Sequence, residues 1–358
     1  MNRRLFLRTT GLALFGAALP LKAARPRKVL VVLFQRGAAD GLNMIVPYGE
    51  RAYAASRPTI AIERKELLGL DGFFGMHPSM QPLLPFWKER SLAIVHAAGS
   101  PDATRSHFDA QDFMETGTPG VKSTKDGFVA RALSSAKSNV PRAVALTSSL
   151  PRMFAGAPDA IAAADLAKFR HDGATKVFAA MYPDAFAAAK VLGSVNASGT
   201  PLQQVAALIK ADVGVEVAFV ETNGWDTHAG QNVPLANNLK RLSDEIAAFA
   251  KSLGSRMSDV VLVTTSEFGR TVKENGNRGT DHGHGTVMLL LGGTARGGKV
   301  HGRWPGLERE QLFEGRDLAV TTDFRDVFAE VLSKHLGVGE MGRVFPGYVP
   351  KAINILQT

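Results

Sequence analysis

The sequence contains no cysteine. Disulfide bonds, thiolate metal ligands and cysteine nucleophiles are therefore excluded. Any metal site in this chain must be built from histidine, carboxylate and hydroxyl groups.

Other features are also missing. No basic run is interleaved with aromatic residues, and a net charge of +9 on 358 residues fits solubility or anionic substrates better than nucleic acid. No internal repeat occurs, and no linker is long enough to separate two domains. The hydrophobic fraction of 45% and the 36 glycines are sufficient for a substantial core and do not indicate global disorder.

The first 24 residues have the pattern of an export leader. Arg3 and Arg4 precede Phe-Leu and an apolar run, Gly11 to Leu21, which is too short for a stable membrane span. Ala23 and Ala24 mark the cleavage zone, although Lys22 interrupts a clean small-residue motif. The pattern predicts a twin-arginine signal peptide at 1–24, recognised by the twin-arginine translocase. The lack of cysteine fits this route, in which a chain folds before it crosses the membrane.

Apolar runs alternate with amphipathic stretches along the rest of the chain. Strands are expected at 29–34, 92–95, 143–146, 217–220, 259–265 and 287–291, and helices at 78–87, 235–253 and 323–335, with a hairpin-like loop at 299–307. This alternation predicts a single α/β domain over 25–358, with a mostly parallel sheet and helices on both faces. The Ala-rich stretch within 150–210 is expected to be a helical insertion or cap.

The densest group of chemically active residues lies at 281–285, Asp-His-Gly-His-Gly. His282 and His284 stand beside a carboxylate and between glycines, which is a metal-ligand pattern that an ordinary turn does not need. Glu267 follows the strand that leads into this loop. The loop is therefore expected to supply part of a metal site.

Two other strands also end in candidate residues. Arg36 and Asp40 follow the first strand, and Asp226 and His228 follow the strand at 217–220. Because parallel strands place their carboxyl ends at one edge of a sheet, these side chains are expected to converge. A turn alone explains Asp40 beside Gly41 and the pair Asn223-Gly224, but it leaves His228 unexplained.

Ser106 allows two compatible interpretations. It is a helix N-cap, with Asp109 at the third helical position. Alternatively, its hydroxyl is a nucleophile at a helix N-terminus, where backbone donors favour an anion. The residues alone favour the cap.

The order of these groups along the chain resembles the alkaline phosphatase and sulfatase superfamily, in which two metals flank a hydroxyl nucleophile. The chain is more similar to an exported bacterial family, domain of unknown function 1501. The segments that carry this resemblance are RGAADGLN (36–43), RSHFDAQ (105–111), GWDTHAGQ (224–231), TSEFGRT (265–271) and DHGHG (281–285). The resemblance implies an alkaline phosphatase-like three-layer sandwich.

The resemblance also implies roles for individual residues. Ser106 takes the nucleophile position. In the hydrolase hypothesis given below, Arg36 or Arg270 would hold substrate oxygens. The implied metal ligands are Asp40, Asp226, His228, Glu267 and His284 or His282. Phe268 stands where the superfamily has a histidine ligand, so the second of the two metal sites is expected to be weakened or lost.

Two functions follow as hypotheses. The first is an exported hydrolase, periplasmic or secreted, that uses a divalent metal (zinc, manganese, magnesium or calcium) to cleave phosphate or sulfate esters of small molecules or glycans. The second is a degenerate envelope protein that binds an anionic glycan or a protein partner without turnover. A purely structural domain ranks last, because it leaves the His-rich loops without a purpose.

Overall fold

The computed structural model describes residues 27–133, 140–166 and 192–357. The described residues form one large sheet with strand order β11-β5-β10-β9-β1-β8-β6-β7, and β12 also pairs with β5. Its strands are β1 (Val29–Gln35), β5 (Leu92–Gly99), β6 (Ala143–Ala145), β7 (Ala160–Ala162), β8 (Val217–Thr222), β9 (Val260–Thr265), β10 (Thr286–Gly292), β11 (Lys299–His301) and β12 (Thr322–Asp323). A small antiparallel sheet joins β2 (Ile45–Val46), β4 (Gly75–Met76) and β3 (Leu68–Gly69).

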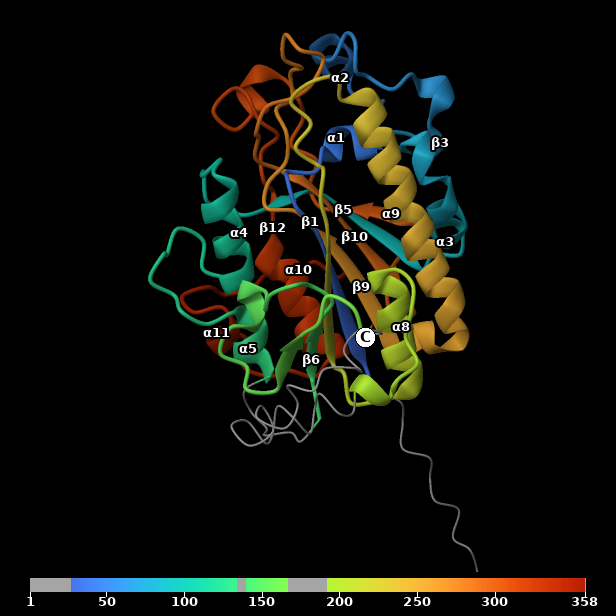
Figure 1. Cartoon of the computed structure of the whole chain (residues 1–358). Coiled ribbons are helices and arrows are strands. Elements are labelled where there is room, and N and C mark those ends of the chain that lie inside the picture. Colours follow the sequence, from blue (N-terminus) through green and yellow to red (C-terminus); the bar gives the residue numbers. More distant parts are fainter. Residues whose placement is uncertain (1–26, 134–139, 167–191, 358) are drawn as a thin grey trace, which may run out of the picture.

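The large sheet is mostly parallel, as expected. Strand β10 is the exception, because it runs antiparallel to both of its neighbours, β5 and β9. The connection from β9 to β10 therefore leaves and re-enters the sheet at one edge. This geometry keeps the whole His-rich loop at the carboxyl edge of the parallel strands, which is the upper edge in Figure 1.

Strand β1 is buried on both faces, which explains its unbroken run of β-branched and large apolar residues. Val29, Val31 and Leu33 belong to one hydrophobic cluster, whereas the alternate residues Leu30 and Val32 belong to another. Because side chains alternate across a strand, the sheet separates two cores. The result is a three-layer α/β sandwich.

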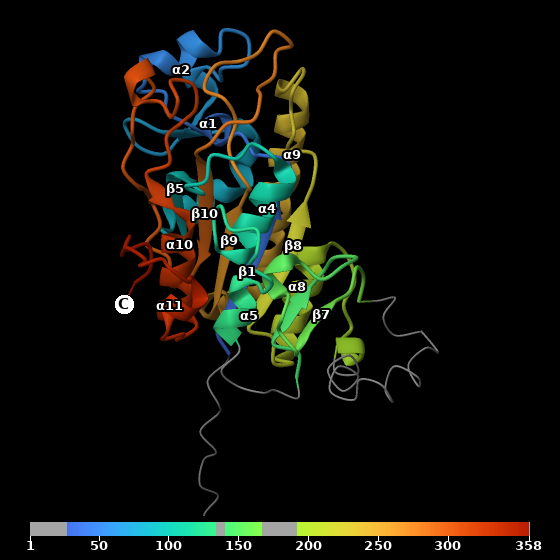
Figure 2. The same ribbon diagram turned by 90° about the vertical axis from the view of Figure 1, so that its left-hand side faces the viewer.

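Helices cover both faces of the sheet (Figures 1 and 2). One layer holds α3 (Leu84–Lys88), α8 (Pro201–Ala211) and α9 (Asn232–Leu253), and the other holds α4 (His107–Thr116), α5 (Phe128–Leu133), α10 (Phe324–Glu330) and α11 (Met341–Val344). Two short helices, α1 (Gly41–Met44) and α2 (Arg51–Ser56), lie above the sheet edge.

Three local expectations need correction. The helix expected at 78–87 is split into a 3-10 segment, Pro78–Leu83, and α3, because prolines interrupt it. The segment at 299–307, expected to be a hairpin-like loop, begins instead with β11, which is parallel to β5. The last helix changes to a π-helical turn at Val331–His335.

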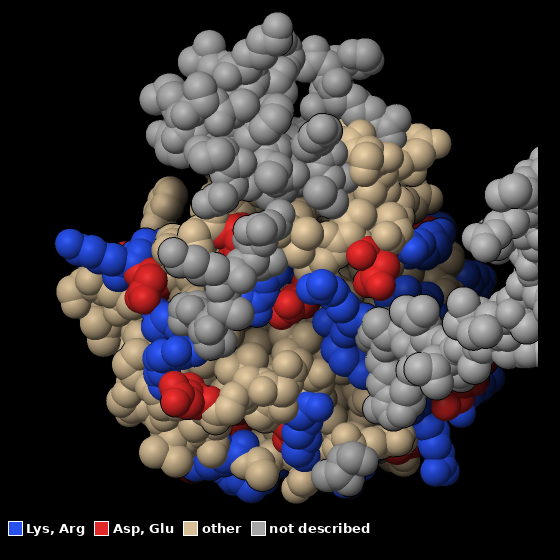
Figure 3. Space-filling view, turned by 90° about the horizontal axis from the view of Figure 1, so that it is seen from below, with Lys and Arg blue, Asp and Glu red and all other residues tan. Residues whose placement is uncertain are grey.

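The predicted leader at 1–24 lies outside the described residues, as do residues 167–191 of the expected insertion. The described remainder of that insertion contributes β7 to the sheet and α8 to a helical layer. None of the described helices is both long and apolar enough to span a membrane. On the face seen in Figure 3, basic and acidic side chains are interspersed.

Candidate metal centre

The upper edge of the sheet gathers the polar segments that follow β1, β5, β8 and β9 and the segment that precedes β10. Glycine makes this convergence possible at two points. Gly37 has a φ of +112°, and a Cβ there would lie 2.8 Å from the backbone nitrogen of Asp226. A Cβ on Gly283 would lie 2.3 Å from the carbonyl carbon of Arg270. Larger residues would separate these loops.

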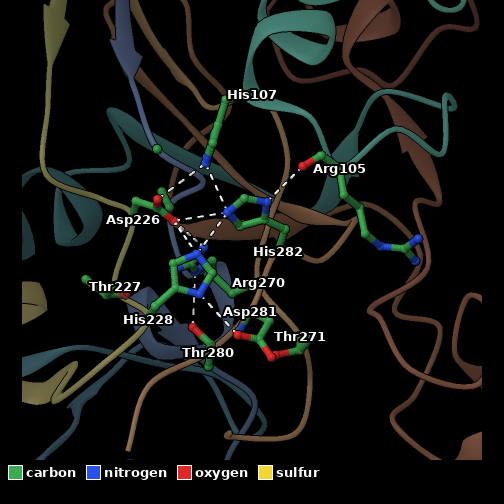
Figure 4. Close-up of polar contacts among 12 residues, drawn as sticks. Arg105, His107, Asp226, Thr227, His228, Arg270, Thr271, Thr280, Asp281 and His282 are labelled. Atoms are coloured by element: carbon green, nitrogen blue, oxygen red, sulfur yellow. Dashed lines mark hydrogen bonds and ion pairs between the residues drawn. The ribbon is translucent and has the colours of Figure 1, made fainter. Parts of the chain in front are cut away.

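Three imidazoles and one carboxylate form a cluster at this edge, called the histidine cluster below: His107, Asp226, His228 and His282 (Figure 4). The Nε2 atom of His282 lies 3.0 Å from Nε2 of His107 and 3.0 Å from Nε2 of His228. Asp226 Oδ1 is 3.0 Å from His228 Nε2 and 3.2 Å from His282 Nε2. Asp226 Oδ2 is 3.5 Å from His107 Nε2.

The other ring nitrogen of each histidine faces an oxygen outside the centre. His107 Nδ1 is 2.8 Å from Glu267 Oε1, and His228 Nδ1 is 3.1 Å from Asp281 Oδ1. His282 Nδ1 is 2.8 Å from the carbonyl oxygen of Arg105. Each of these oxygens can accept a hydrogen bond from an N–H at Nδ1, and in that tautomer a neutral ring presents its Nε2 lone pair to the centre.

This arrangement fits a metal ion. Lone pairs on nitrogens 3.0 Å apart repel unless a cation or a proton lies between them. Histidine ligands in metal sites usually donate their other N–H to a carboxylate or a backbone carbonyl, and all three Nδ1 atoms face such an oxygen here. Imidazole and carboxylate ligands suit zinc or a similar first-row metal.

Charges around the cluster act on its protonation. Burial would raise the pKa of Asp226, but the guanidinium of Arg270 and the nearby histidines lower it below its usual value. The hydrogen bond to Glu267 raises the pKa of His107, whereas burial lowers the pKa of His282. The carboxylate is therefore held ionised, as a metal ligand must be.

Glu267 lies behind the cluster, not among the inward-facing atoms. Its Oε1 accepts from His107 Nδ1, from Gln111 Nε2 at 2.9 Å and from the backbone N–H of Gly37 at 2.8 Å. Its Oε2 accepts from Ser266 Oγ at 3.0 Å. Burial opposes ionisation of Glu267, but these hydrogen bonds lower its pKa overall. The geometry assigns Glu267 to orienting His107, although the sequence predicted it as a direct ligand.

Asp40, also predicted as a ligand, lies in a separate buried network. Its Oδ2 accepts from Arg57 Nη1 at 2.7 Å and from Gln231 Nε2 at 2.5 Å. Arg57 also donates to Asn43 Oδ1 at 2.6 Å. Among the described residues, Asp40 Oδ1 has no hydrogen-bond partner. The structure thus pairs the Asp40 charge with an arginine of its own.

The two predicted arginines hold carboxylates of the protein. Arg36 pairs with Glu115 at 2.7 Å and with Glu221 at 3.0 Å. The side chain of Arg270 is 0% exposed, and its Nη1 donates to Asp226 Oδ1 at 2.8 Å. In this conformation Arg270 supports the cluster from beneath instead of facing solvent.

Ser106 and His284 also lie apart from the inward-facing atoms. Ser106 is the N-cap of α4, and its hydroxyl accepts from the backbone N–H of Asp109 at 3.4 Å. The ring of His284 is buried and stacks on Phe313, with 4.2 Å between ring centroids. In the His-Gly-His segment, His282 reaches the cluster, whereas His284 packs on Phe313.

Sequence reasoning missed His107 as a site residue. It follows Ser106 directly at the first position of α4, within the RSHFDAQ segment. The available signal was an imidazole at the first position of a helix, in the segment that follows a strand. Phe268 has a visible role as well, because its ring packs at 5.0 Å from His107 and 5.1 Å from His282, measured between centroids.

Comparison with known proteins supports part of this description. A family model described as "Protein of unknown function (DUF1501)" matches residues 202–348, which confirms that resemblance over this part of the chain. The matched part contains Asp226, His228 and His282, whereas His107 lies before it. A search of the curated proteins finds no match.

Solved structures of similar fold are distant. The chain is similar to the C-terminal periplasmic domain of EcEptC from Escherichia coli in complex with zinc, at 9% identity and a TM-score of 0.37, over 74% of this chain and 73% of that one. TAB5 alkaline phosphatase, a mutant with magnesium bound, has 11% identity and a TM-score of 0.35, over 74% and 90%. A phosphonate monoester hydrolase of Agrobacterium radiobacter has 10% identity and a TM-score of 0.36, over 91% and 79%. These scores are too low to support an inference about function.

Proposed function

We propose that this chain is a metal-dependent hydrolase of phosphate or sulfate esters with one metal centre. The observation that carries the proposal is the approach of three Nε2 atoms to one another and to the Asp226 carboxylate, with an oxygen facing each Nδ1. Within this cluster, His107, Asp226 and His282 form a group with the spacing of metal ligands. His107, Asp226, His228 and His282 would hold the ion. A divalent metal bound there would supply a Lewis acid for an ester oxygen and lower the pKa of a bound water.

The protein's own groups prepare this site. Arg270 keeps Asp226 ionised, and Glu267 orients His107. The side chains of His107 and His282 are 24% exposed and those of Asp226 and His228 are 44% exposed, so a substrate can reach the cluster from solvent. A catalytic zinc site keeps one coordination position open, and three protein ligands such as His107, Asp226 and His282 would leave one for water or substrate.

Ser106 remains our proposed nucleophile. It is exposed and adjacent in sequence to His107, at the start of α4. If its only role is the cap, Ser106→Ala should lower the free energy of unfolding by about 1 kcal/mol and leave turnover intact. Loss of ester turnover with the metal retained would support the nucleophile.

A second function keeps the site but not the reaction. Phe268 packs against His107 and His282, and Asp40 is paired with Arg57, so these two positions supply no free ligand to the second metal site that the superfamily resemblance implies. An envelope protein that binds an anionic glycan or a protein partner would need only one ion or none. Anion binding without turnover in excess divalent metal would favour this alternative.

We also propose export by the twin-arginine pathway to the periplasm or the exterior, which rests on the leader at 1–24. The amino-terminal sequence of the protein recovered from the periplasm would test it. Arg3→Lys/Arg4→Lys should retain the uncleaved chain in the cytoplasm. Normal export of this variant would count against the pathway.

The metal centre is best tested with a matched pair of variants, His282→Ala and His284→Ala. The two residues lie in one loop, two positions apart, but only His282 reaches the cluster. Elemental mass spectrometry of the purified protein should find about one equivalent of metal in the wild type and in His284→Ala, and little in His282→Ala. Metal retained by His282→Ala, or absent from the wild type, would overturn the proposed centre. Aryl phosphate and aryl sulfate turnover, measured on the same samples, then tests the reaction.

A further inference from the structure

A groove of about 700 Å³ lies beside the histidine cluster. Four basic residues, Arg51, Lys273, Arg309 and Arg316, line it together with alanine, valine and leucine side chains. Glu308 is the one acidic residue in the lining. The groove lining thus combines basic and apolar side chains.

The groove and the histidine cluster share a wall. Arg316 Nη2 donates to the carbonyl oxygen of His282 at 2.6 Å, and the backbone N–H of Val272 donates to the Arg316 carbonyl at 3.3 Å. Arg270 pairs with His282 as an isolated β-bridge, only three residues before Lys273. The groove and the cluster are therefore adjacent, separated by the backbone around Arg270 and by Arg316.

The charges in the groove are largely uncompensated. Arg51, Lys273 and Arg309 are exposed, and none of them forms an ion pair within the described part of the chain. The carboxylate of Glu308 is engaged in a capping box with Gln311. Several positive charges in a concave site raise the local concentration of anions.

We propose that this groove binds a second anionic group of the substrate, so that the preferred ester is a polyanion that carries further phosphate or sulfate groups. This inference rests on the proposed function, because the reacting ester would lie at the histidine cluster. None of the residues that line the groove is aromatic, so it lacks the stacking platform that nucleobases use. Phosphate and sulfate share the chemistry that the groove recognises, and the choice between them is left to two probes.

The test compares two double variants that lose the same charge. Lys273→Gln/Arg309→Gln removes cations from the groove. Arg296→Gln/Lys299→Gln removes two exposed cations from a second basic pocket, of about 660 Å³. The backbone N–H of Gly298, in that pocket, donates to Leu92 at the start of β5, which is the opposite edge of the sheet. The control therefore has the same net charge as the groove variant, and the two differ only in where the charges are removed.

Binding of inorganic tripolyphosphate and of a sulfated heparin hexasaccharide would be measured by calorimetry on the full chain, with and without His282→Ala. The groove variant should bind at least one probe roughly tenfold more weakly than the wild type, because two exposed ion pairs are lost. The control should stay within about twofold. The probe that shows the effect identifies phosphate or sulfated sugar as the ligand chemistry.

Equal weakening in both double variants would overturn the proposal, because it would show a general charge effect. Binding that His282→Ala weakens and the groove variant leaves unchanged would also overturn it, since the probes would then occupy the cluster and not the groove. Absence of metal from the wild type would overturn the proposed function, but it would leave the groove measurement readable. The two proposals therefore fail by different results.

Discussion

Asp40 and Asp226 follow neighbouring strands, β1 and β8, at the same edge of the sheet, yet their surroundings differ. Asp40 is 1% exposed, and it is neutralised by Arg57. The side chain of Asp226 is 44% exposed, and it shares its oxygens among Arg270 and the three imidazoles of the histidine cluster. The comparison teaches that a carboxylate at the carboxyl edge of the sheet is a candidate metal ligand. The residues that pair with this carboxylate then decide whether it is available to a metal ion.

The histidines of the two regions repeat this contrast. Near Asp40, His96 is buried, and both of its ring nitrogens are bonded to the backbone, Nε2 to the Ile45 carbonyl and Nδ1 to the Ala97 N–H. Burial lowers the pKa of His96 to about 4. The histidines of the cluster are partly exposed, and their Nε2 atoms face one another. Satisfied buried imidazoles support the fold, and convergent exposed ones suit a ligand.

The largest expected effect comes from Asp40→Asn. It leaves the buried guanidinium of Arg57 without its carboxylate, which typically costs about 3 to 5 kcal/mol in free energy of unfolding. Urea unfolding measures this loss. The exposed pair Lys240–Asp244 is the control, because Asp244→Asn should cost less than about 1 kcal/mol. The metal content of Asp40→Asn should equal that of the wild type, and its loss in a stable variant would make Asp40 a ligand.

The next effect is a dependence of stability on pH. The pKa of His96 is about 4 in the folded protein and about 6.5 in the unfolded chain. Between these values only the unfolded chain binds the proton, so the free energy of unfolding falls as pH falls through this window, by about 3 kcal/mol for His96 alone. Above pH 6.5 His96 is neutral in both the folded and the unfolded state, and below pH 4 the loss of unfolding free energy is complete.

Chemical denaturation at several pH values measures this slope. His96→Gln should reduce this slope, whatever the overall stability of the variant. His77, whose pKa burial also lowers to about 4, adds a similar slope that His96→Gln leaves in place. A slope equal to that of the wild type in His96→Gln would contradict the assignment.

A third effect should appear in metal binding and hardly at all in stability. His228→Ala removes a partly exposed ligand, so the metal dissociation constant should rise more than about a hundredfold, beyond the usual effect of an outer partner. The free energy of unfolding of the metal-free protein should change by less than about 1 kcal/mol. Competition with a chelating dye measures the first quantity. A large loss of stability without metal would instead make the cluster a structural element like the Asp40 network.

The smallest of these effects concerns Glu267→Gln. The amide still fills the space, but it no longer offers a carboxylate to His107 Nδ1. Loss of an outer partner of this kind typically lowers metal affinity by about 10- to 100-fold. The same competition measurement applies, with His284→Ala as a control. A loss far beyond this range would place Glu267 among the direct ligands.

Much of the fold could be predicted from the sequence. Runs such as 29–34 and 260–263 are apolar without interruption because their strands are buried on both faces, and this pattern is local. The orientation of β10 could not be predicted in this way, since an apolar run is the same in either direction. Pairing with β5 and β9 decides it.

The candidate site also has features that the sequence predicts and others that only the tertiary structure shows. The sequence by itself determined that carboxylates and imidazoles, among them Asp226, His228 and His282, arrive at one edge of a parallel sheet. Only the tertiary structure decided that His282 faces the cluster while His284 packs on Phe313, and that His107 joins it. The physical reason is that residue type is encoded locally, whereas the direction and partners of a side chain depend on segments far away in the chain. His107 meets Glu267 across 160 positions, and no local pattern contains that contact.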